Sequence, residues 1–477
     1  MMYDVTVIGG GVVGGLILRQ LTKYKLSVCL LEKENDLSMG ASRANSGVVH
    51  GGFDAKEGTL KARFNVEGNR LMEGVCEELG VGFKRNGSLV VAFSEEEIST
   101  LEELKARGEK NGVPGLEILS RERLFELEPN IADSAVGALY APTGGLVCPY
   151  NLTIAAIGNA MDNGAEVFTD FEVVSARKED DGFTVTAADG RQVKTKLVVN
   201  AAGLFSGEIS KIFGDGTIKI GARRGQYILL DRESGDHVKM TIFKTPTKAG
   251  KGVLVLPTVD GNLLIGPTSE ELSAPSTETT REGLEEVIKK ASSMCRNLPL
   301  HNTITSFSGI RAYSYTHDFI IEESKIVKGL INCAGIESPG LTAAPAIAEY
   351  VVNGLIGRLL VLKTNESFNG RRPKSHFFAH LDNGEKNALI KKNPAYGRIV
   401  CRCEKITEGE IIDAITSNPP ARSVDAVKRR TRAGMGRCQG GFCQPHVAEI
   451  LADQLGIDFE KVTKSGGESF LNLGVTK

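Results

Sequence analysis

The sequence predicts an α/β protein of more than one domain, and three observations lead to this fold class. A glycine-rich turn joins two apolar runs near the N-terminus, strand-like runs alternate with helical stretches in the middle, and four of the nine cysteines gather beyond residue 400. At 477 residues the chain exceeds the size at which a single core usually keeps growing, so we expect two or three domains. The 55 glycines and 41% hydrophobic residues are typical of a globular protein with many turns.

The charge and hydropathy of the chain exclude several classes of protein. A net charge of −2 gives no overall field toward nucleic acid or an anionic membrane. We find no apolar run long enough for a transmembrane segment and no signal peptide at the N-terminus. The sequence therefore predicts a soluble, cytoplasmic protein that could meet a membrane only through a partner. Five cysteines lie singly among apolar residues, as buried thiols do: Cys29, Cys76, Cys148, Cys295 and Cys333.

The first element is a strand, a glycine turn, a helix and a second strand that ends on an acid. Residues 3–32 carry this pattern, with Gly9 for a tight turn, Gly11 for close approach to a pyrophosphate and Gly14 for packing of the helix on the strand. The helix N-terminus would supply free N–H donors to the phosphates. Glu32 is placed to accept hydrogen bonds from ribose hydroxyls. The pattern predicts a Rossmann-like dinucleotide-binding unit.

The next segments favour FAD over NAD. Residues 36–52, DLSMGASRANSGVVHGG, are rich in small and hydroxyl side chains that can wrap the ribityl chain and pyrophosphate of a long flavin dinucleotide. Two later strand-to-glycine turns, in residues 196–206 and 328–355, repeat the small-residue design. Three such turns spread along the chain predict a discontinuous FAD-binding domain.

Five segments together carry a resemblance to a known family: ASRANSGVVHGG, VVNAAGLFS, RRGQYILLD, FSGIRAYS and GIESPGLTAAPAIA. They resemble the D-amino-acid oxidase superfamily of FAD-dependent oxidoreductases over about residues 1–360. Within it the chain is most similar to the branch of glycerol-3-phosphate and L-2-hydroxyglutarate dehydrogenases. From the motifs and this resemblance we expect the following residues to bind FAD: Gly9, Gly11, Gly14, Glu32, Lys33, Ser42, Arg43, Asn45, Ser46, Gly47, Val173, Ala202, Gly203, Gly309, Gly335, Ile336, Glu337, Ser338, Gly340 and Leu341.

Two insertions of different texture interrupt the FAD-binding segments, and the resemblance implies that they form one β-sheet cap over the substrate. Alternating strand-like runs such as GSLVVAF and GVLVLPT support this reading. A polar stretch then leads to the cysteine-rich end. The expected boundaries are 1–79, 146–217 and 301–362 for the FAD-binding domain, and 80–145 and 218–300 for the substrate cap. They are followed by a linker at 363–396, a small domain at 397–456 that holds the last four cysteines, and a tail at 457–477.

Three residues are candidates for the chemistry. His50 follows the ribityl-wrapping segment and is suited to proton transfer near neutral pH; a structural histidine or a covalent flavin anchor are its alternatives. Arg311 offers a planar fork of donors to a carboxylate or phosphate, and the resemblance implies that it faces the flavin. Arg223, with its neighbour Arg224, is a second choice, since a solvated basic pair explains it equally well.

The last cysteines form two clips, Cys401 with Cys403 and Cys438 with Cys443. They lie among short predicted helices, one opened by the capping box of Thr407. Four thiolates can hold either Zn²⁺ or an iron–sulfur cluster. One intervening residue in the first clip is cramped for a zinc knuckle, and the pattern resembles the bacterioferritin-associated ferredoxin type of [2Fe-2S] domain, with a longer second clip. We therefore favour a [2Fe-2S] cluster and keep zinc as the alternative.

A basic run lies between the clips, and its usual meaning is a solvated helix face. Beside an anionic cluster it would also balance charge, raise the reduction potential and invite an acidic redox partner. No aromatic residues interleave the charges, so a nucleic-acid site is not expected. The run comprises Arg422, Lys428, Arg429, Arg430, Arg432 and Arg437.

The resemblance implies an FAD-dependent dehydrogenase that oxidises a small anionic alcohol and passes electrons through the cluster to a partner. Glycerol 3-phosphate, oxidised to dihydroxyacetone phosphate, is the leading substrate. L-2-hydroxyglutarate comes second and an amino acid or other secondary amine third. The expected acceptor is a second flavoprotein, a ferredoxin or a quinone-linked subunit. The alternative from another class is a non-catalytic electron-transfer subunit.

Overall fold

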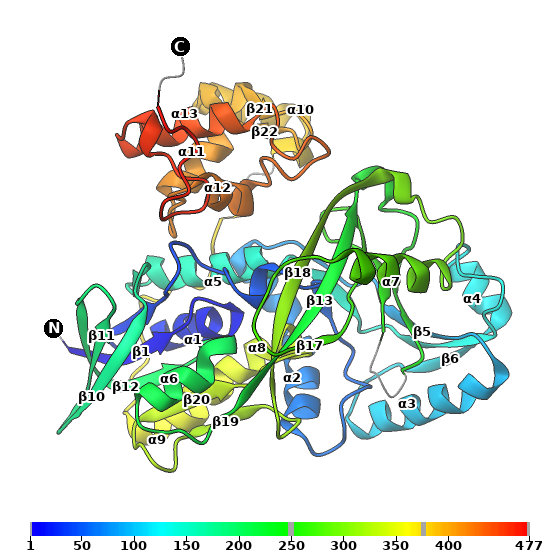
Figure 1. The fold of residues 1–477 in the computed structure, drawn as a ribbon, viewed down its shortest axis with the longest axis horizontal. Coiled ribbons are helices and arrows are strands. Elements are labelled where there is room, and N and C mark those ends of the chain that lie inside the picture. Colours follow the sequence, from blue (N-terminus) through cyan, green and yellow to red (C-terminus); the bar gives the residue numbers. More distant parts are fainter. Residues whose placement is uncertain (1, 247–251, 374–377, 475–477) are drawn as a thin grey trace.

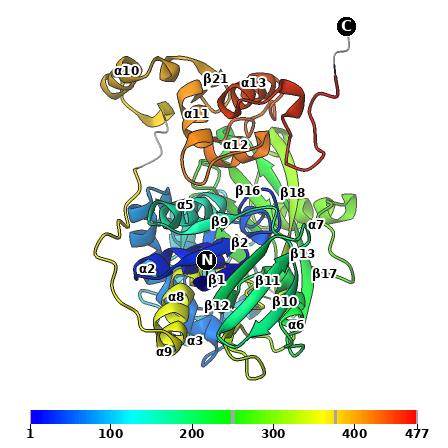
Figure 2. The same ribbon diagram turned by 90° about the vertical axis from the view of Figure 1, so that its left-hand side faces the viewer.

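The computed structural model describes residues 2–246, 252–373 and 378–474. Two large sheets form the body of the protein, and a small helical unit lies on one side of it (Figure 1). We call this unit, residues 383–474, the C-terminal module. The turned view in Figure 2 shows the same arrangement, with the module above α5 (Pro149–Asp162) and away from α9 (Gly357–Leu359).

The first sheet begins with the strand that the sequence predicts at the N-terminus. β1 runs parallel to β12 on one side and to β2 on the other, and β12 also pairs in parallel with β20. All three segments that the sequence analysis placed in a folded-back dinucleotide domain therefore meet in one sheet. Its strands are β1 (Met2–Ile8), β2 (Val28–Leu31), β9 (Glu166–Phe168), β10 (Val173–Glu179), β11 (Gly182–Ala187), β12 (Gln192–Asn200), β19 (Ile320–Glu323) and β20 (Leu330–Ala334).

Helices with small and aliphatic faces cover this sheet. α1 packs against both α5 and α8, and α2 packs against α8. Their inward side chains, among them Ile17, Leu152 and Ile347, are fully buried in one apolar core with the strands, which is where most of the stabilising free energy of such a layer arises. The helices of this part, besides α5 and α9, are α1 (Val12–Thr22), α2 (Leu60–Leu79), α6 (Ser206–Ile212) and α8 (Gly340–Glu349). α8 continues as a π-helix over Tyr350–Ile356.

The second sheet, which we call the cap sheet, has nine strands and is antiparallel except where β14 meets β5. β18 pairs with β13 along its whole length, so a strand that the sequence analysis grouped with the FAD-binding segments lies in the cap sheet. The domain boundaries themselves stay a prediction. The strands are β5 (Ser88–Ala92), β6 (Glu117–Ser120), β7 (Gly137–Ala141), β13 (Ile220–Leu230), β14 (Thr241–Lys244), β15 (Leu254–Pro257), β16 (Leu263–Gly266), β17 (Glu270–Leu272) and β18 (Thr303–Ser314).

Three helices flank the cap sheet, and a small third sheet joins it to the FAD side. The helices are α3 (Ile98–Lys110), α4 (Arg121–Leu127) and α7 (Arg281–Ser292). In the third sheet, β8 (Gly145–Val147) pairs with β3 (Val48–Val49) and with β4 (Phe83–Lys84). β3 immediately precedes His50, so this sheet holds the backbone of a candidate catalytic residue.

The C-terminal module follows the sequence-based expectation closely at its helices. Thr407 and Glu410 form the predicted capping box, each side chain accepting a hydrogen bond from the other residue's backbone N–H. Residues 363–396, read from the sequence as a linker, also contain a helix, α10, whose own capping box starts at Asp382. The elements of the module are α10 (Asn383–Lys392), β21 (Ile399–Cys401), β22 (Ile406–Thr407), α11 (Glu408–Thr416), α12 (Val424–Thr431) and α13 (Gln444–Leu455).

Four of the six residues of the basic run bind carboxylates outside the module instead of forming a purely solvated face. Arg429 and Arg430 both bind the buried carboxylate of Asp36, which lies just after the second strand of the first sheet. Arg432 binds Asp260 next to the cap sheet, and Arg437 binds Asp231 and Glu233. These four charges, which the sequence suggests could attract an acidic partner, dock the module on the rest of the chain.

The five singly placed cysteines lie buried, as their apolar surroundings predict. Burial raises the pKa of each thiol to about 12 in Cys29, Cys76, Cys148, Cys295 and Cys333. Across the described residues no helix has both the length and the apolar character needed to cross a bilayer.

Candidate active site and cluster site

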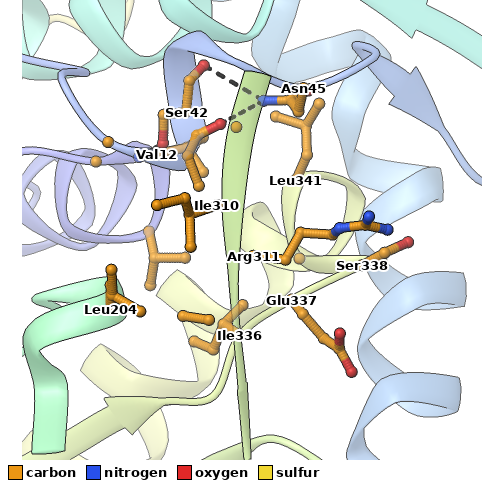
Figure 3. A pocket seen from close by; sticks show the side chains of 18 of the residues that line it. Val12, Ser42, Asn45, Leu204, Ile310, Arg311, Ile336, Glu337, Ser338 and Leu341 are labelled. Carbon is orange, nitrogen blue, oxygen red and sulfur yellow. Dashed lines mark hydrogen bonds between the residues drawn. The ribbon is translucent and has the colours of Figure 1, made fainter. Parts of the chain in front are cut away.

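One large cavity of about 940 Å³ lies between the two sheets. The glycine turn after β1, the segment after β2, part of β18 and the turn between β20 and α8 line it, as the close view in Figure 3 shows. Its volume is at the upper end of the range for ligand pockets. A large dinucleotide together with a small substrate fits a cavity of this size.

The turn after β1 is close-packed in a way that only glycine allows. Gly9 has a φ of +113°, and a Cβ there would lie 2.4 Å from the Ala201 carbonyl oxygen. Glu32 accepts a hydrogen bond from the Gly10 N–H at 2.6 Å, so the predicted ribose acid also closes the turn. Burial raises the pKa of Glu32, while hydrogen bonds from the Glu34 and Gly10 N–H groups oppose that rise.

The segment that the sequence assigns to the ribityl chain is folded against this turn. Ser42 Oγ accepts a hydrogen bond from the Val12 N–H at the start of α1, at 2.9 Å. Asn45 holds the segment together by donating to the Ala41 and Ser42 carbonyls (Figure 3). A Cβ on Gly309 of β18 would lie 1.9 Å from the Ala44 carbonyl oxygen, so glycine is required where the cap sheet meets this segment.

The cavity brings together most of the residues predicted to bind FAD. Three of them lie outside its lining: Gly14, which packs against the Gly9 carbonyl, Gly47 and Gly335. The roles of all of them stay predictions. Those in the lining are Gly9, Gly11, Glu32, Lys33, Ser42, Arg43, Asn45, Ser46, Val173, Ala202, Gly203, Gly309, Ile336, Glu337, Ser338, Gly340 and Leu341.

Several lining residues carry no sequence signal. Lys61, from α2, reaches the cavity and binds Glu337 at 2.8 Å, and Tyr227, Phe243 and Thr268 come from the cap sheet and the turn beside it. Tyr227 lies in RRGQYILLD, a segment that carries the family resemblance, but nothing in that segment singles out this side chain. Lys61, Phe243 and Thr268 lie in ordinary stretches of sequence, so only the tertiary packing identifies them.

His50 lies in the cavity wall with its backbone fixed on both sides. Its N–H donates to the Thr342 hydroxyl at 2.9 Å, and its carbonyl accepts from Asn65 and Asn69 of α2. The ring nitrogen Nε2 lies 3.2 Å from the Ser338 hydroxyl. This arrangement directs the imidazole to one place in the cavity, as a proton-transferring group requires.

Arg311 lines the same cavity from β18, and its guanidinium donates hydrogen bonds to carbonyl oxygens. It donates to the Thr268 carbonyl at 2.6 Å, more weakly to the Arg224 carbonyl, and its buried Nε has no hydrogen-bond partner. Among the described residues, no carboxylate pairs with it. Because a buried unsatisfied donor is costly, Arg311 is suited to hold an anionic ligand.

Arg223 is a weaker candidate for that role. It binds Glu271 at 3.0 Å and Glu337 at 3.4 Å, and its guanidinium lies over the Tyr313 ring. Glu337 also binds Lys61. The positive charge of Arg223 is therefore already balanced within the cavity wall.

The two cysteine clips come together in the C-terminal module as two pairs, each with one cysteine from either clip. Cys403 Sγ lies 3.6 Å from Cys438 Sγ, and the Cys401 and Cys443 side chains are hydrogen-bonded to each other. Within the described residues, no three His, Cys, Asp or Glu side chains converge as they would around one metal ion. Four cysteines around two irons are the usual ligands of a [2Fe-2S] cluster, and two pairs fit that arrangement.

Backbone N–H groups surround these sulfur atoms. The hydrogen bond from Cys443 lowers the pKa of Cys401 to about 6 against its burial, helped by the Gly434 and Glu404 N–H groups. For Cys438, the N–H groups of Gly440 and Phe442 contribute to a pKa below the usual thiol value, although burial alone would raise it. Such N–H donors stabilise thiolate ligands and tune cluster potentials.

Comparison with known families agrees with both sites. Residues 4–353 match the family described as FAD dependent oxidoreductase. The chain belongs to this family. Residues 399–453 match the BFD-like [2Fe-2S] binding domain, so the cofactors of this FAD-dependent oxidoreductase are FAD and a [2Fe-2S] cluster, as the sequence predicts. The glycine turn and the paired thiols described above are the structural counterparts of these matches.

Three relatives illustrate how far the similarity extends. A protein named glycerol 3-phosphate dehydrogenase from Caloramator mitchellensis is 49% identical over 477 residues, covering 100% of this chain and 99% of that protein. A glycerol 3-phosphate oxidase from Mycoplasma genitalium is 33% identical over 77% of this chain and 96% of its own length. The FAD-bound structure of L-alpha-glycerophosphate oxidase from Mycoplasma pneumoniae superposes with a TM-score of 0.74 at 32% identity, covering 78% of this chain and 98% of that one.

Proposed function

We propose that this enzyme oxidises glycerol 3-phosphate to dihydroxyacetone phosphate and passes the electrons singly through its [2Fe-2S] cluster to an external acceptor. The observation that carries the proposal is the full-length 49% identity to the Caloramator protein named glycerol 3-phosphate dehydrogenase. The Arg311 guanidinium in the cavity supports an anionic substrate, because among the described residues it has no carboxylate partner and its Nε has no hydrogen bond. We place the enzyme in the cytoplasm, as the sequence predicts.

Two of the three candidate residues have a role in this proposed reaction. Arg311 binds the phosphate and fixes the orientation of the substrate, since a guanidinium matches the geometry of two phosphate oxygens. His50 takes the hydroxyl proton on its ring, and the Ser338 hydroxyl beside Nε2 helps to set the imidazole orientation. FAD, when bound, would be the hydride acceptor. The side chains of the cap sheet shield the cavity from bulk water.

The electron exit passes through the module. A flavin holds two electrons, whereas a [2Fe-2S] cluster carries one, so the cluster suits a one-electron acceptor such as a ferredoxin, a second flavoprotein or a quinone-linked subunit. Cys403 is exposed and Cys438 half-buried, while Cys401 and Cys443 are buried. We expect the acceptor to approach the Cys403 side of the cluster.

An anaerobic substrate screen tests the first half of the proposal. Glycerol 3-phosphate should bleach the flavin absorbance rapidly, while L-2-hydroxyglutarate and glycine should not. L-2-hydroxyglutarate is the informative competitor because a human L-2-hydroxyglutarate dehydrogenase is 33% identical over 56% of this chain. Bleaching by that acid alone would replace the proposed substrate with it.

Replacement of one cluster ligand tests the second half. Cys438→Ser should leave flavin bleaching intact and abolish reduction of a one-electron acceptor protein. Cys295→Ala, at a buried thiol of the cap side, is the matched control and should keep both activities. Rapid reduction of oxygen by the iron-replete enzyme, with transfer to other acceptors unchanged in Cys438→Ser, would contradict the proposed electron exit.

A further inference from the structure

Tyr150 connects the FAD side of the protein to the C-terminal module. It lies in the first turn of α5, is half-buried, and its hydroxyl donates a hydrogen bond to Met435 Sδ at 3.5 Å. A buried tyrosine hydroxyl normally finds a partner, and here part of that requirement is met across the interface. The contact is uncharged, unlike the arginine contacts that dock the module.

The module end of this contact lies directly against the cluster ligands. Met435 lies between Gly434 and Gly436, and both glycines touch ligand cysteines. The Gly434 N–H donates to the Cys401 sulfur, and a Cβ on Gly436 would lie 2.4 Å from Cys403 Cβ. Gln439 fixes the turn by donating to the Met435 and Gly436 carbonyls.

The other end of the contact leads to the cavity within a few residues. β8 ends at Val147, three residues before Tyr150, and the Val147 N–H donates to the Gly47 carbonyl at 2.9 Å. β8 also pairs with β3, in which Val48 lines the cavity. An almost unbroken series of covalent bonds and hydrogen bonds therefore runs from the cavity wall to the cluster cysteines.

We propose that Tyr150 and Met435 form the electronic contact through which the cluster is reduced. The inference rests on the proposed electron exit through the [2Fe-2S] cluster. Electronic coupling passes more effectively through bonds, hydrogen bonds and polarisable groups than across gaps, and the thioether sulfur that accepts the Tyr150 hydrogen bond is such a polarisable group. Tyr150 and Met435 are positioning residues, because neither binds substrate or iron.

The transfer is a one-electron step. One electron leaves the two-electron-reduced flavin and reduces one ferric ion of the oxidised cluster to ferrous, while the proton released from the flavin passes to water. The second electron follows after an external one-electron carrier protein has taken the first. Tyr150 and Met435 are neither oxidised nor reduced overall.

The charged contacts of the module do not offer an equivalent connection. Asp36 lies between Glu34 and Met39, which line the cavity, but its partners Arg429 and Arg430 belong to α12 and not to the loops that hold the cysteines. Arg437 is next to Cys438, but its partner Asp231 is not among the residues that line the cavity. These charged contacts hold the module in place. Among the interface contacts described for this chain, the Tyr150 contact alone has one end beside the cavity wall and the other beside the cluster ligands.

The test measures electron transfer inside the holoenzyme after rapid mixing with glycerol 3-phosphate under anaerobic conditions. Flavin bleaching and the later appearance of the reduced cluster are followed separately, by absorbance and by low-temperature electron paramagnetic resonance. The variants are Tyr150→Phe, Met435→Leu and the double variant, which keep ring and volume. Tyr140→Phe in β7 and Met161→Leu in α5 are the matched controls, and rates are compared together with each variant's flavin and cluster midpoint potentials.

We expect each interface variant to slow cluster reduction several-fold at unchanged potentials, with flavin bleaching as in the wild type. The double variant should be no slower than the slower single variant, because both act on one contact. Rates equal to those of the controls, or additive losses, would overturn the inference while the cluster could still accept electrons by another route. Failure of the wild-type cluster to become reduced would instead overturn the proposed electron exit.

Discussion

Replacement of Asp36 by Asn should release the C-terminal module from the body of the protein. Asp36 is 4% exposed and accepts four hydrogen bonds, from Arg429 at 2.6 and 3.1 Å and from Arg430 at 2.8 and 3.0 Å. Asparagine keeps the shape but removes the charge that compensates two buried guanidinium groups. Breaking a buried ion pair on one side costs about 3–5 kcal/mol.

The lost docking free energy determines how much of the module should be undocked. A loss of about 3 kcal/mol in docking free energy corresponds to a roughly hundredfold larger undocked population. Limited proteolysis between residues 363 and 396, and hydrogen exchange at α12, report that population in the holoenzyme. Arg437→Ala is the control, because its exposed contacts with Asp231 and Glu233 are of the kind that contributes little.

The same ion pair gives the docking a pH dependence. Burial alone would raise the pKa of Asp36, but the charges and hydrogen bonds of Arg430 and Arg429 outweigh it and hold that pKa below its usual value. The stabilisation is therefore complete above the unfolded-state pKa of about 3.9 and is lost as the pH falls through the lower folded-state value. Equal proteolysis of the Asp36→Asn and Arg437→Ala proteins near neutral pH would show that the Asp36 ion pairs do not hold the module in place.

Three further changes test the cavity and the cap sheet. Gly309→Ala should cost about 1–3 kcal/mol by forcing β18 away from the Ala44 carbonyl, and the released FAD, measured by fluorescence, should increase; unchanged retention would contradict the close approach. Arg311→Met should lower kcat/KM for glycerol 3-phosphate roughly 10- to 100-fold, with Arg311→Lys recovering part of the loss; equal values in the two variants would argue against phosphate binding. Glu128→Gln should remove a pH dependence of stability, because burial raises the Glu128 pKa to about 7, so the stability of the wild type falls as the pH rises from about 4.3 through 7. The melting temperature of Glu128→Gln relative to the wild type should accordingly increase between pH 5 and 8, and a constant difference would show that Glu128 does not titrate as described.

The sequence predicts the parts of the fold whose signals are local. The glycine turn at Gly9, the capping box at Thr407 and the cysteine clips each depend on a few adjacent residues, and each has its own conformational reason. The family resemblance adds the order of the FAD-binding segments. These signals are sufficient for the fold class and the cofactors, and most of the residues they single out for FAD line the cavity.

The remainder depends on contacts between distant residues. The partner of Arg429 is Asp36, 393 positions earlier, and nothing in either local sequence indicates the pairing. For the same reason Lys61 and Phe243 reach the cavity without a motif, and Arg223 looks available until Glu271 and Glu337 are placed beside it. Charge patterns alone cannot distinguish a solvated run from an internal interface.

The way the C-terminal module is held has a mechanical consequence. Arg429 and Arg430 bind the segment that follows β2. Arg432 binds Asp260 and Asn262 next to the cap sheet. The unit that carries the cluster is thus also a brace between the two walls of the cavity.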